Sequence, residues 1–287
     1  MQSSKLRIGI ISAEKSGDYL AASFIESLKS SGRDFELFGI GGKELDKFNI
    51  SRPQDFDREI LNVMGIIDPL KNLRQILRAR KQILDFLISK NINIFIGVDS
   101  PDLNSFFHKK LKKINSTINF QIVSPSVWAW RSGRVKQLRK FVDTTFCLFK
   151  FEHEYLKKNN VNSFHVGHPF QDIEKVEDVS SIKNRYEIKN DSECLTFLVG
   201  SRRSEISNML SIYKKVIKKV YEGDKSYSFL FPVVNQDHKN IIQAELSGLE
   251  TPIFVQTDKM KEFLSLSTFT ISTSGTASLE AACYGNI

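Results

Sequence analysis

The sequence predicts an α/β protein with two Rossmann-like domains, each a mostly parallel sheet with helices on both faces. Short apolar runs typical of buried strands alternate with longer amphipathic segments along most of the 287 residues. The polar stretch 171–190, which lacks strand periodicity, interrupts this alternation. Polar and glycine-containing motifs directly follow several apolar runs, where open parallel sheets bind ligands. We therefore predict domains at residues 1–170 and 171–287, the second of them incomplete.

The first domain is expected to begin with a buried strand followed by an amphipathic helix, in which Leu20, Ile25 and Leu28 share one face. The glycines within residues 39–42 lack the Gly-Lys-Ser/Thr ending of a P-loop, so we predict a tight turn there. The strands predicted for this domain are 7–12, 36–40, 92–98, 119–123, 144–149 and 163–166, with helices at 19–30 and 103–114.

The second domain repeats the alternation of strand and helix. Its predicted elements are strands at 194–199, 228–232 and near Ile253 and Phe269, a helix at 204–221 and another opened by Ser278. The chain stops at Ile287, directly after this last helix, where a parallel sheet is expected to continue with another strand. We therefore expect the chain to be truncated at this end.

The composition indicates a globular protein, because 41% apolar residues in a chain of this length can form two cores. Cys147, Cys194 and Cys283 are odd in number and widely spaced, which argues against a disulfide framework or a cysteine metal site. This predicts a reducing compartment, the cytoplasm. The apolar run at 8–11 is too short for a signal peptide, and no run approaches the roughly 18 residues of a membrane span.

The formal net charge of +8 is unevenly distributed, since residues 103–142 contain nine Lys or Arg and no Asp or Glu. Such a block can attract an anionic surface or nucleotide phosphates, and compositional drift is the alternative explanation. Nucleic-acid binding is disfavoured because the lysines are not interleaved with aromatic residues.

Six motifs carry the chemistry of the chain. Both tryptophans, Trp128 and Trp130, lie in one Pro-Ser-Val-Trp-Ala-Trp run that is expected to wall a ligand. The other motifs are 11–18, 97–104, 167–169, 199–205 and 272–280. In this order the six motifs resemble those of the lipid-A-disaccharide synthase family, glycosyltransferases of two Rossmann-like domains (GT-B type). The sequence departs from the residues usual in that family at Ala13, Lys15 and Val199. These positions lie next to the polar residues of the motifs, which are themselves unchanged.

The resemblance implies an inverting transfer from UDP-2,3-diacylglucosamine to 2,3-diacylglucosamine 1-phosphate. The products would be the β-1,6 lipid A disaccharide 1-phosphate and UDP, with no cofactor and no metal. Its partners would be this UDP-sugar donor, the acylated glucosamine phosphate acceptor and the anionic inner-membrane surface, which the enzyme would contact peripherally from the cytoplasm. A homodimer stays open as an alternative.

Two carboxylates are the predicted catalytic residues. Asp99 directly follows a buried strand, and Pro101 delays the next helix, so its carboxylate is expected at the lip of the strand as a general base. Glu14 follows the first strand, and the resemblance implies that it orients the acceptor or the sugar. A helix cap for Asp99 and a surface loop charge for Glu14 are the alternatives. Asn104 is predicted to be a supporting amide at the substrate site.

The nucleotide is expected to bind the loops that follow two strands of the second domain. The guanidinium of Arg202 can hold two phosphate oxygens, and small residues beside it allow close approach. Glu280 could accept hydrogen bonds from ribose hydroxyls. The predicted binding residues are Gly200, Ser201, Arg202, Ser274, Gly275, Thr276 and Glu280, with His168 and Trp128 nearby.

An amphipathic segment after Gly65 is predicted to contact the membrane, because aliphatic side chains alternate there with cations. The contact residues are Ile66, Ile67, Leu70, Leu73, Arg74, Leu77 and Arg78. A core helix would show the same apolar stripe, so that alternative stays open.

Two other functions stay open. One is another UDP-sugar enzyme of the same fold, either a peptidoglycan-precursor transferase or a UDP-N-acetylglucosamine 2-epimerase. The tryptophan run and the amphipathic segment disfavour the epimerase. The other is an inactive, basic, membrane-binding remnant.

Overall fold

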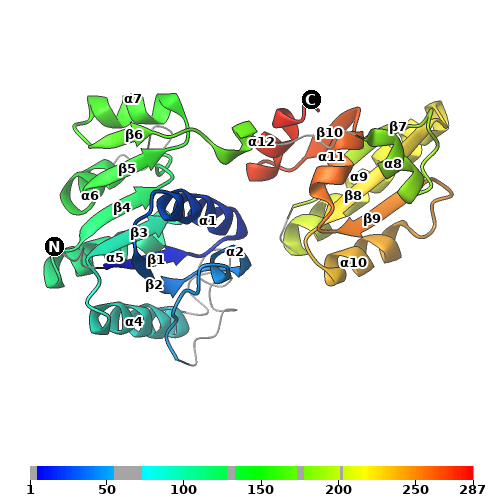
Figure 1. Ribbon diagram of the computed structural model, residues 1–287. Coiled ribbons are helices and arrows are strands. Elements are labelled where there is room, and N and C mark those ends of the chain that lie inside the picture. Colours follow the sequence, from blue (N-terminus) through cyan, green and yellow to red (C-terminus); the bar gives the residue numbers. More distant parts are fainter. Residues whose placement is uncertain (1–4, 55–72, 128–132, 173–177, 201–202, 287) are drawn as a thin grey trace. The chain divides into compact units, whose positions relative to one another are not determined.

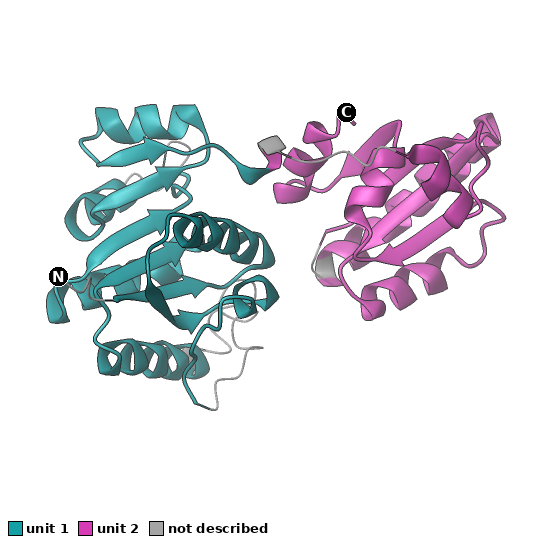
Figure 2. Cartoon of the chain, in the orientation of Figure 1, with its two compact units in different colours: residues 1–169 teal, residues 170–287 magenta. Residues whose placement is uncertain are grey.

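The computed structural model describes residues 5–54, 73–127, 133–172, 178–200 and 203–286. The chain divides into two compact units, residues 1–169 and 170–287, which Figure 2 draws in separate colours. Within its described residues, each unit is an open sheet of parallel strands with helices packed on both faces (Figure 1). No described helix has the length and apolarity needed to cross a bilayer.

The described strands of unit 1 follow the order β2-β1-β3-β4-β5-β6, and every pairing is parallel. The strands are β1 (Leu6–Ser12), β2 (Phe35–Ile40), β3 (Ile94–Val98), β4 (Ile118–Ile122), β5 (Thr144–Cys147) and β6 (Ser163–His165). The helices are α1 (Lys15–Ser30), α2 (Lys43–Asp46), α4 (Leu73–Ser89), α5 (Pro101–Ile114), α6 (Gly133–Phe141) and α7 (Lys150–Lys158), followed by the 3-10 turn η1 (Pro169–Asp172). Strand β2 pairs with one edge of β1. Strand β3 pairs with the other edge, and β4, β5 and β6 follow it outward in chain order.

Both faces of this sheet are buried, which explains why its strands are continuous apolar runs rather than alternating ones. Ile8 and Ile10 pack beneath α1, whereas Ile11 faces the opposite layer formed by α4 and α5. The first helix begins at Lys15, four residues before the predicted start, because its polar first turn shows no apolar periodicity.

Gly97 lets α5 approach β3 closely. A Cβ atom at this position would lie 2.8 Å from His108 Nε2 and 2.9 Å from Asn104 Cβ. Both neighbouring side chains are almost fully buried, so neither can move aside easily.

The described strands of unit 2 follow the order β10-β7-β8-β9, again all parallel. The strands are β7 (Glu193–Leu198), β8 (Tyr227–Val233), β9 (Ile253–Thr257) and β10 (Phe269–Ser272). The helices are α8 (Val179–Arg185), α9 (Arg203–Gly223), α10 (Gln236–Leu246), α11 (Met260–Leu266) and α12 (Thr276–Cys283). The aromatic rings of Phe197, Phe229 and Phe231 form the centre of the core under α9.

The polar stretch 171–190, for which no element was predicted, contains α8. The carboxylate of Asp178 caps this helix by accepting a hydrogen bond from the Ser181 N–H at 3.0 Å. Ile182 anchors it in the core. Two turns with one buried residue are too short to show a clear period in sequence.

We expect Gly97→Ala to destabilise unit 1 by about 1–3 kcal/mol, because the added methyl group overpacks the contact between β3 and α5. Urea unfolding followed by circular dichroism measures the change. Gly223→Ala is the matched control, since a Cβ at the end of α9 meets nothing within 4 Å. Equal stability of the two variants would contradict the tight contact at Gly97.

Candidate functional site

The order of strands in unit 1 reverses between β1 and β3, which lie side by side with Ser12 paired to Val98. Open α/β sheets bind ligands at such a reversal, outside the carboxyl ends of the strands. Glu14 follows β1 and Asp99 follows β3, so both predicted catalytic residues belong to the segments that leave this point.

The main chain at Asp99 adopts an unusual conformation. Asp99 has φ +49° and Ser100 has φ +38°, so two consecutive non-glycine residues are left-handed. Helix α5 then begins directly at Pro101, two residues earlier than predicted. Proline occupies the first helical position readily because its missing N–H would have no helical partner there. The left-handed pair, rather than a delayed helix, therefore separates the Asp99 carboxylate from α5.

The first turn of α1 lies against Asp99. A Cβ on Gly17 would come within 2.9 Å of Ser12 Oγ and 3.6 Å of Asp99 Cβ, so only a glycine allows this approach without a shift. Glu14 is the N-cap residue of α1, and its main-chain oxygen accepts a hydrogen bond from the Asp18 N–H at 2.9 Å. The positive end of the α1 dipole therefore lies beside the two carboxylate-bearing segments.

Asp18 is buried and fastens α1 to the glycine turn after β2. Its carboxylate accepts hydrogen bonds from the N–H of Gly42 at 2.7 Å and of Glu44 at 2.8 Å. A side chain on Gly42 would clash with this carboxylate, at 2.6 Å from Oδ2. The predicted tight turn is therefore held in place by the Asp18 carboxylate.

Burial raises the pKa of the Asp99 carboxyl above its usual range, and a hydrogen bond from the Ser100 main-chain N–H opposes the rise. A carboxylate with a raised pKa is a stronger base than a solvated aspartate. Burial lowers the pKa of the His168 imidazole, because the charged form of this ring is the protonated one. His168 is 8% exposed and precedes Pro169 at the end of unit 1.

Asn104 is fully buried and supports the main chain at Asp99. Its Nδ2 donates to the carbonyl oxygens of Val98 at 3.1 Å and of Asp99 at 2.8 Å. A direct contact of Asn104 with substrate stays a prediction. Gln121 Nε2 also donates to the Asp99 carbonyl, at 3.2 Å. Gln121 was not predicted from the sequence; the available signal was that two polar residues, Asn119 and Gln121, alternate with apolar ones in the strand that precedes the tryptophan run.

The candidate nucleotide residues lie at the equivalent reversal in unit 2. Here β10 and β7 are neighbours, with Ser272 paired to Leu198. The Thr273 N–H donates to the Leu198 carbonyl at 3.1 Å, which holds the segment after β10 beside the segment after β7. The loops that begin at Val199 and Thr273 therefore start side by side, as the strand-end positions predict.

Gly200 and Gly275 have φ of +91° and +155°, conformations that disfavour other residues. A Cβ on Gly200 would lie 2.3 Å from the Glu205 carboxylate in the first turn of α9. Gly275 is the N-cap residue of α12, and Ser278 Oγ donates to its carbonyl at 2.6 Å. Gly275 therefore shapes the start of α12, where main-chain N–H groups can face an anion, and Gly200 leaves room for the Glu205 carboxylate.

Ser274 and Thr276 are exposed on either side of Gly275, and Glu280 is half-buried farther along α12. Ser201, Arg202 and Trp128 lie outside the described residues. Within the described ranges, no group of three or more His, Cys, Asp or Glu side chains could hold a metal ion.

The predicted membrane segment falls only partly within the described residues. Ile66, Ile67 and Leu70 lie outside them, as does the side chain of Leu73. In α4, Leu77 is 53% exposed, and Arg74 and Arg78 are exposed as well. The buried residues of this helix form its core face and are Ile76, Ala79, Ile83, Leu84 and Leu87. The helix therefore has both a core face and an exposed face that carries predicted membrane residues.

A family model described as lipid-A-disaccharide synthetase matches residues 8–286. The lipid-A-disaccharide synthase of Hydrogenovibrio crunogenus is 35% identical over 276 residues, covering 95% of this chain and 73% of that protein. The lipid-A-disaccharide synthase of Methylobacillus flagellatus is 31% identical over 282 residues, covering 96% and 73%.

Solved structures resemble the fold. The S. aureus MnaA–UDP structure has a TM-score of 0.69 at 13% identity, covering 98% of this chain and 77% of that one. The UDP-GlcNAc 2-epimerase of Methanocaldococcus jannaschii, in complex with UDP-GlcNAc and UDP, has a TM-score of 0.62 at 13% identity, covering 98% and 82%. These likenesses confirm the predicted pair of Rossmann-like domains of GT-B type.

We expect Asp99→Asn to raise the melting temperature at neutral pH. The raised pKa means that the folded state disfavours the ionised carboxylate, so Asp99 costs stability above its folded pKa. The amide removes that cost. The advantage of the variant should shrink as the pH falls through the folded pKa of Asp99 towards the ordinary value. Thermal melts across this pH range measure it, and a variant less stable at every pH would contradict the assigned burial.

Proposed function

The chain belongs to the lipid-A-disaccharide synthetase family, and from this premise we propose that it joins UDP-2,3-diacylglucosamine to 2,3-diacylglucosamine 1-phosphate. The 6-hydroxyl oxygen of the acceptor attacks the anomeric carbon of the donor while the bond from that carbon to the UDP oxygen breaks. Attack opposite the leaving group inverts the anomeric centre and yields the β-1,6 disaccharide. UDP leaves with the electron pair of the broken bond.

Asp99 is the proposed general base that takes the proton of the acceptor hydroxyl. The observation that carries this assignment is its position after β3, at the reversal of strand order, with a pKa raised by burial. Glu14, which follows the neighbouring strand β1, is the proposed orienting carboxylate for the acceptor or the sugar. Neither role requires a metal ion or a cofactor.

We place the UDP moiety at the loops of unit 2. The departing diphosphate carries negative charge, which main-chain N–H groups at helix starts and the Arg202 guanidinium would stabilise. The proposed contacts are Gly200, Ser201, Arg202, Ser274, Gly275 and Thr276, with Glu280 accepting from the ribose and His168 and Trp128 near the nucleotide. The left-handed glycines, which leave room beside the main chain, support this placement.

Acylated sugars reside in a lipid surface, so the enzyme has to work at one. We propose that the exposed face of α4 lies on the anionic inner leaflet from the cytoplasmic side, with Leu77 in the acyl region and Arg74 and Arg78 at the headgroups. The exposure of all three side chains supports this arrangement.

Asp99→Asn tests the proposed reaction. We expect turnover to fall by at least about a hundredfold, because the amide cannot accept the hydroxyl proton. The assay follows formation of the acylated disaccharide phosphate from the two purified substrates.

The control for this variant is its affinity for UDP, measured by calorimetry, which should stay nearly unchanged because the nucleotide contacts lie in other residues. Near-normal turnover would remove Asp99 from the role of base. Absence of disaccharide formation by the unmodified protein would overturn the proposed function itself.

Replacing the exposed residues of α4 tests the membrane contact. The double variant Leu77→Ser with Arg74→Gln should weaken binding to vesicles containing anionic lipid by about tenfold or more. A buried aliphatic side chain contributes roughly 1.5–3 kcal/mol, and a basic side chain near an anionic surface about 1 kcal/mol. Co-sedimentation with the vesicles measures the loss.

Ile114→Ser is the matched control for this experiment, because Ile114 is 54% exposed but lies on α5, outside the proposed contact. Both proteins should keep the melting transition of the unmodified chain. Equal vesicle binding by the two variants would move the membrane contact to another surface.

A further inference from the structure

Gln121, the last residue but one of β4, lies at the carboxyl ends of two neighbouring strands, β3 and β4. Its side chain is 2% exposed, and Nε2 donates to the carbonyl oxygens of Asp99 at 3.2 Å, Ile122 at 3.0 Å and Val123 at 3.3 Å. One amide group therefore holds the main chain that leaves β3 and the main chain that leaves β4.

The carbonyls that Gln121 holds belong to a strained part of the chain. Asp99 and Ser100 are left-handed, and Val123 has φ +72°. A β-branched residue in that region is a genuine outlier. Such conformations persist only where the surrounding structure holds them, and they cluster at functional sites. Gln121 and Asn104 are the buried amides that do so at the Asp99 carbonyl.

The orientation of the Gln121 amide is determined by its partners. Carbonyl oxygens can only accept, so the NH₂ group must face them and Oε1 must face the other way. There Oε1 lies 2.9 Å from His108 Nε2. Because Oε1 also only accepts, His108 Nε2 must carry the ring proton. If the proton were on Nδ1 instead, the Nε2 lone pair of His108 would face the lone pairs of Gln121 Oε1. The Gln121 amide would then tend to flip, which would place its oxygen against the three carbonyl oxygens.

The surroundings of His108 keep its ring neutral and fixed. Burial lowers the pKa of the imidazole to about 4, and its Nδ1 has no hydrogen-bond partner in the part of the chain that the structure describes. The imidazole packs edge-on against the Phe95 ring, with 4.9 Å between the two ring centroids, and Gly97 leaves room for it on β3.

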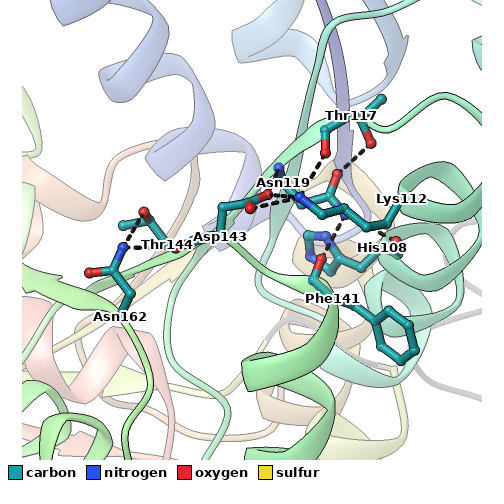
Figure 3. Close-up of polar contacts among 8 residues, drawn as sticks. All are labelled: His108, Lys112, Thr117, Asn119, Phe141, Asp143, Thr144 and Asn162. Carbon is teal, nitrogen blue, oxygen red and sulfur yellow. Dashed lines mark hydrogen bonds and ion pairs between the residues drawn. The ribbon is translucent and has the colours of Figure 1, made fainter.

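A second set of hydrogen bonds fixes the helix that carries His108. Asn119 Nδ2 donates to the main-chain oxygen of His108 at 3.0 Å and to that of Phe141 at 2.7 Å (Figure 3). The Asn119 N–H donates to the Asp143 carboxylate, which also pairs with Lys112 of α5. Helix α5 is thus connected to β4 at His108 and, through Asp143, at Lys112.

We propose that the buried His108–Gln121 pair is a positioning unit for Asp99. His108 donates from Nε2 and thereby orients the Gln121 amide, and the amide holds the left-handed main chain that points the Asp99 carboxylate. Because the same amide holds Val123, it also sets the start of the Ser124–Pro125 segment that leads to the tryptophan run. The catalytic part of this inference rests on the proposed function; the structural part does not.

Three variants test the pair in the disaccharide assay. Gln121→Glu keeps the shape but replaces the donor by an oxygen, and His108→Leu removes the donor to Oε1. Each should lower kcat by at least about thirtyfold with KM within about threefold, since misplacing a reacting group by about 1 Å can cost a hundredfold. His108→Gln can place an N–H near the position of Nε2 and should keep at least about a third of kcat.

A merely structural role would give a different pattern. In that case His108→Leu and His108→Gln would lose stability without a selective loss of kcat in the folded protein. His153→Leu is the control, because His153 also bonds a single polar side chain, Ser163 Oγ at 2.9 Å, but lies on α7. Equal kcat loss in His108→Gln and His108→Leu, or a loss carried by KM, would overturn the proposal.

A measurement that needs no activity separates this inference from the proposed function. Nitrogen-15 NMR of the His108 ring should show the proton on Nε2, unchanged from about pH 5 to 8. A crystal structure of His108→Leu should show Asp99 or Ser100 released from the left-handed region. A proton on Nδ1, or an unchanged main chain in that variant, would overturn the positioning role even in a protein that forms the disaccharide.

Discussion

The parallel pairing of β1 with β3 is the constraint on which the site in unit 1 depends. Because Ser12 pairs with Val98, the segments leaving these strands emerge together at one edge of the sheet. Crossover connections place helices on the faces, so the space beyond this edge is bounded by helix starts rather than helix flanks. The first turn of α1 and the left-handed pair before α5 are the two boundaries that result.

The close approach of helices to strands at that edge depends on glycines, which have no side chain. Gly17 lets α1 lie against Asp99, and Gly97 lets α5 bring His108 and Asn104 against β3. Gly200 serves unit 2 in the same manner beside Glu205. The resulting contacts bury polar groups, and burying a polar group costs free energy unless it is hydrogen-bonded. The amides of Asn104 and Gln121 meet that requirement for the Asp99 carbonyl.

Stability and chemistry are opposed at Asp99. Burial makes the ionised carboxylate unfavourable, and the left-handed main chain adds strain. The same two features give a basic oxygen in a defined place, as the proposed role of general base requires. The two cores of this unit lie on the two faces of the sheet, one under α1 and the other under the helices α4 and α5.

The sequence by itself determined the alternation of strands and helices, the positions of the polar motifs and the family. These features are local, since apolar period and motif order are visible along the chain. Only the tertiary structure decided that Asp18 clamps a turn 24 residues away, that Ile76 faces the core while Leu77 is exposed, and that His108 orients Gln121. Such pairings depend on strand register and helix rotation, and a one-residue shift would separate the partners. The sequence does not indicate that His108 and Gln121 interact, because only folding brings them within hydrogen-bond distance.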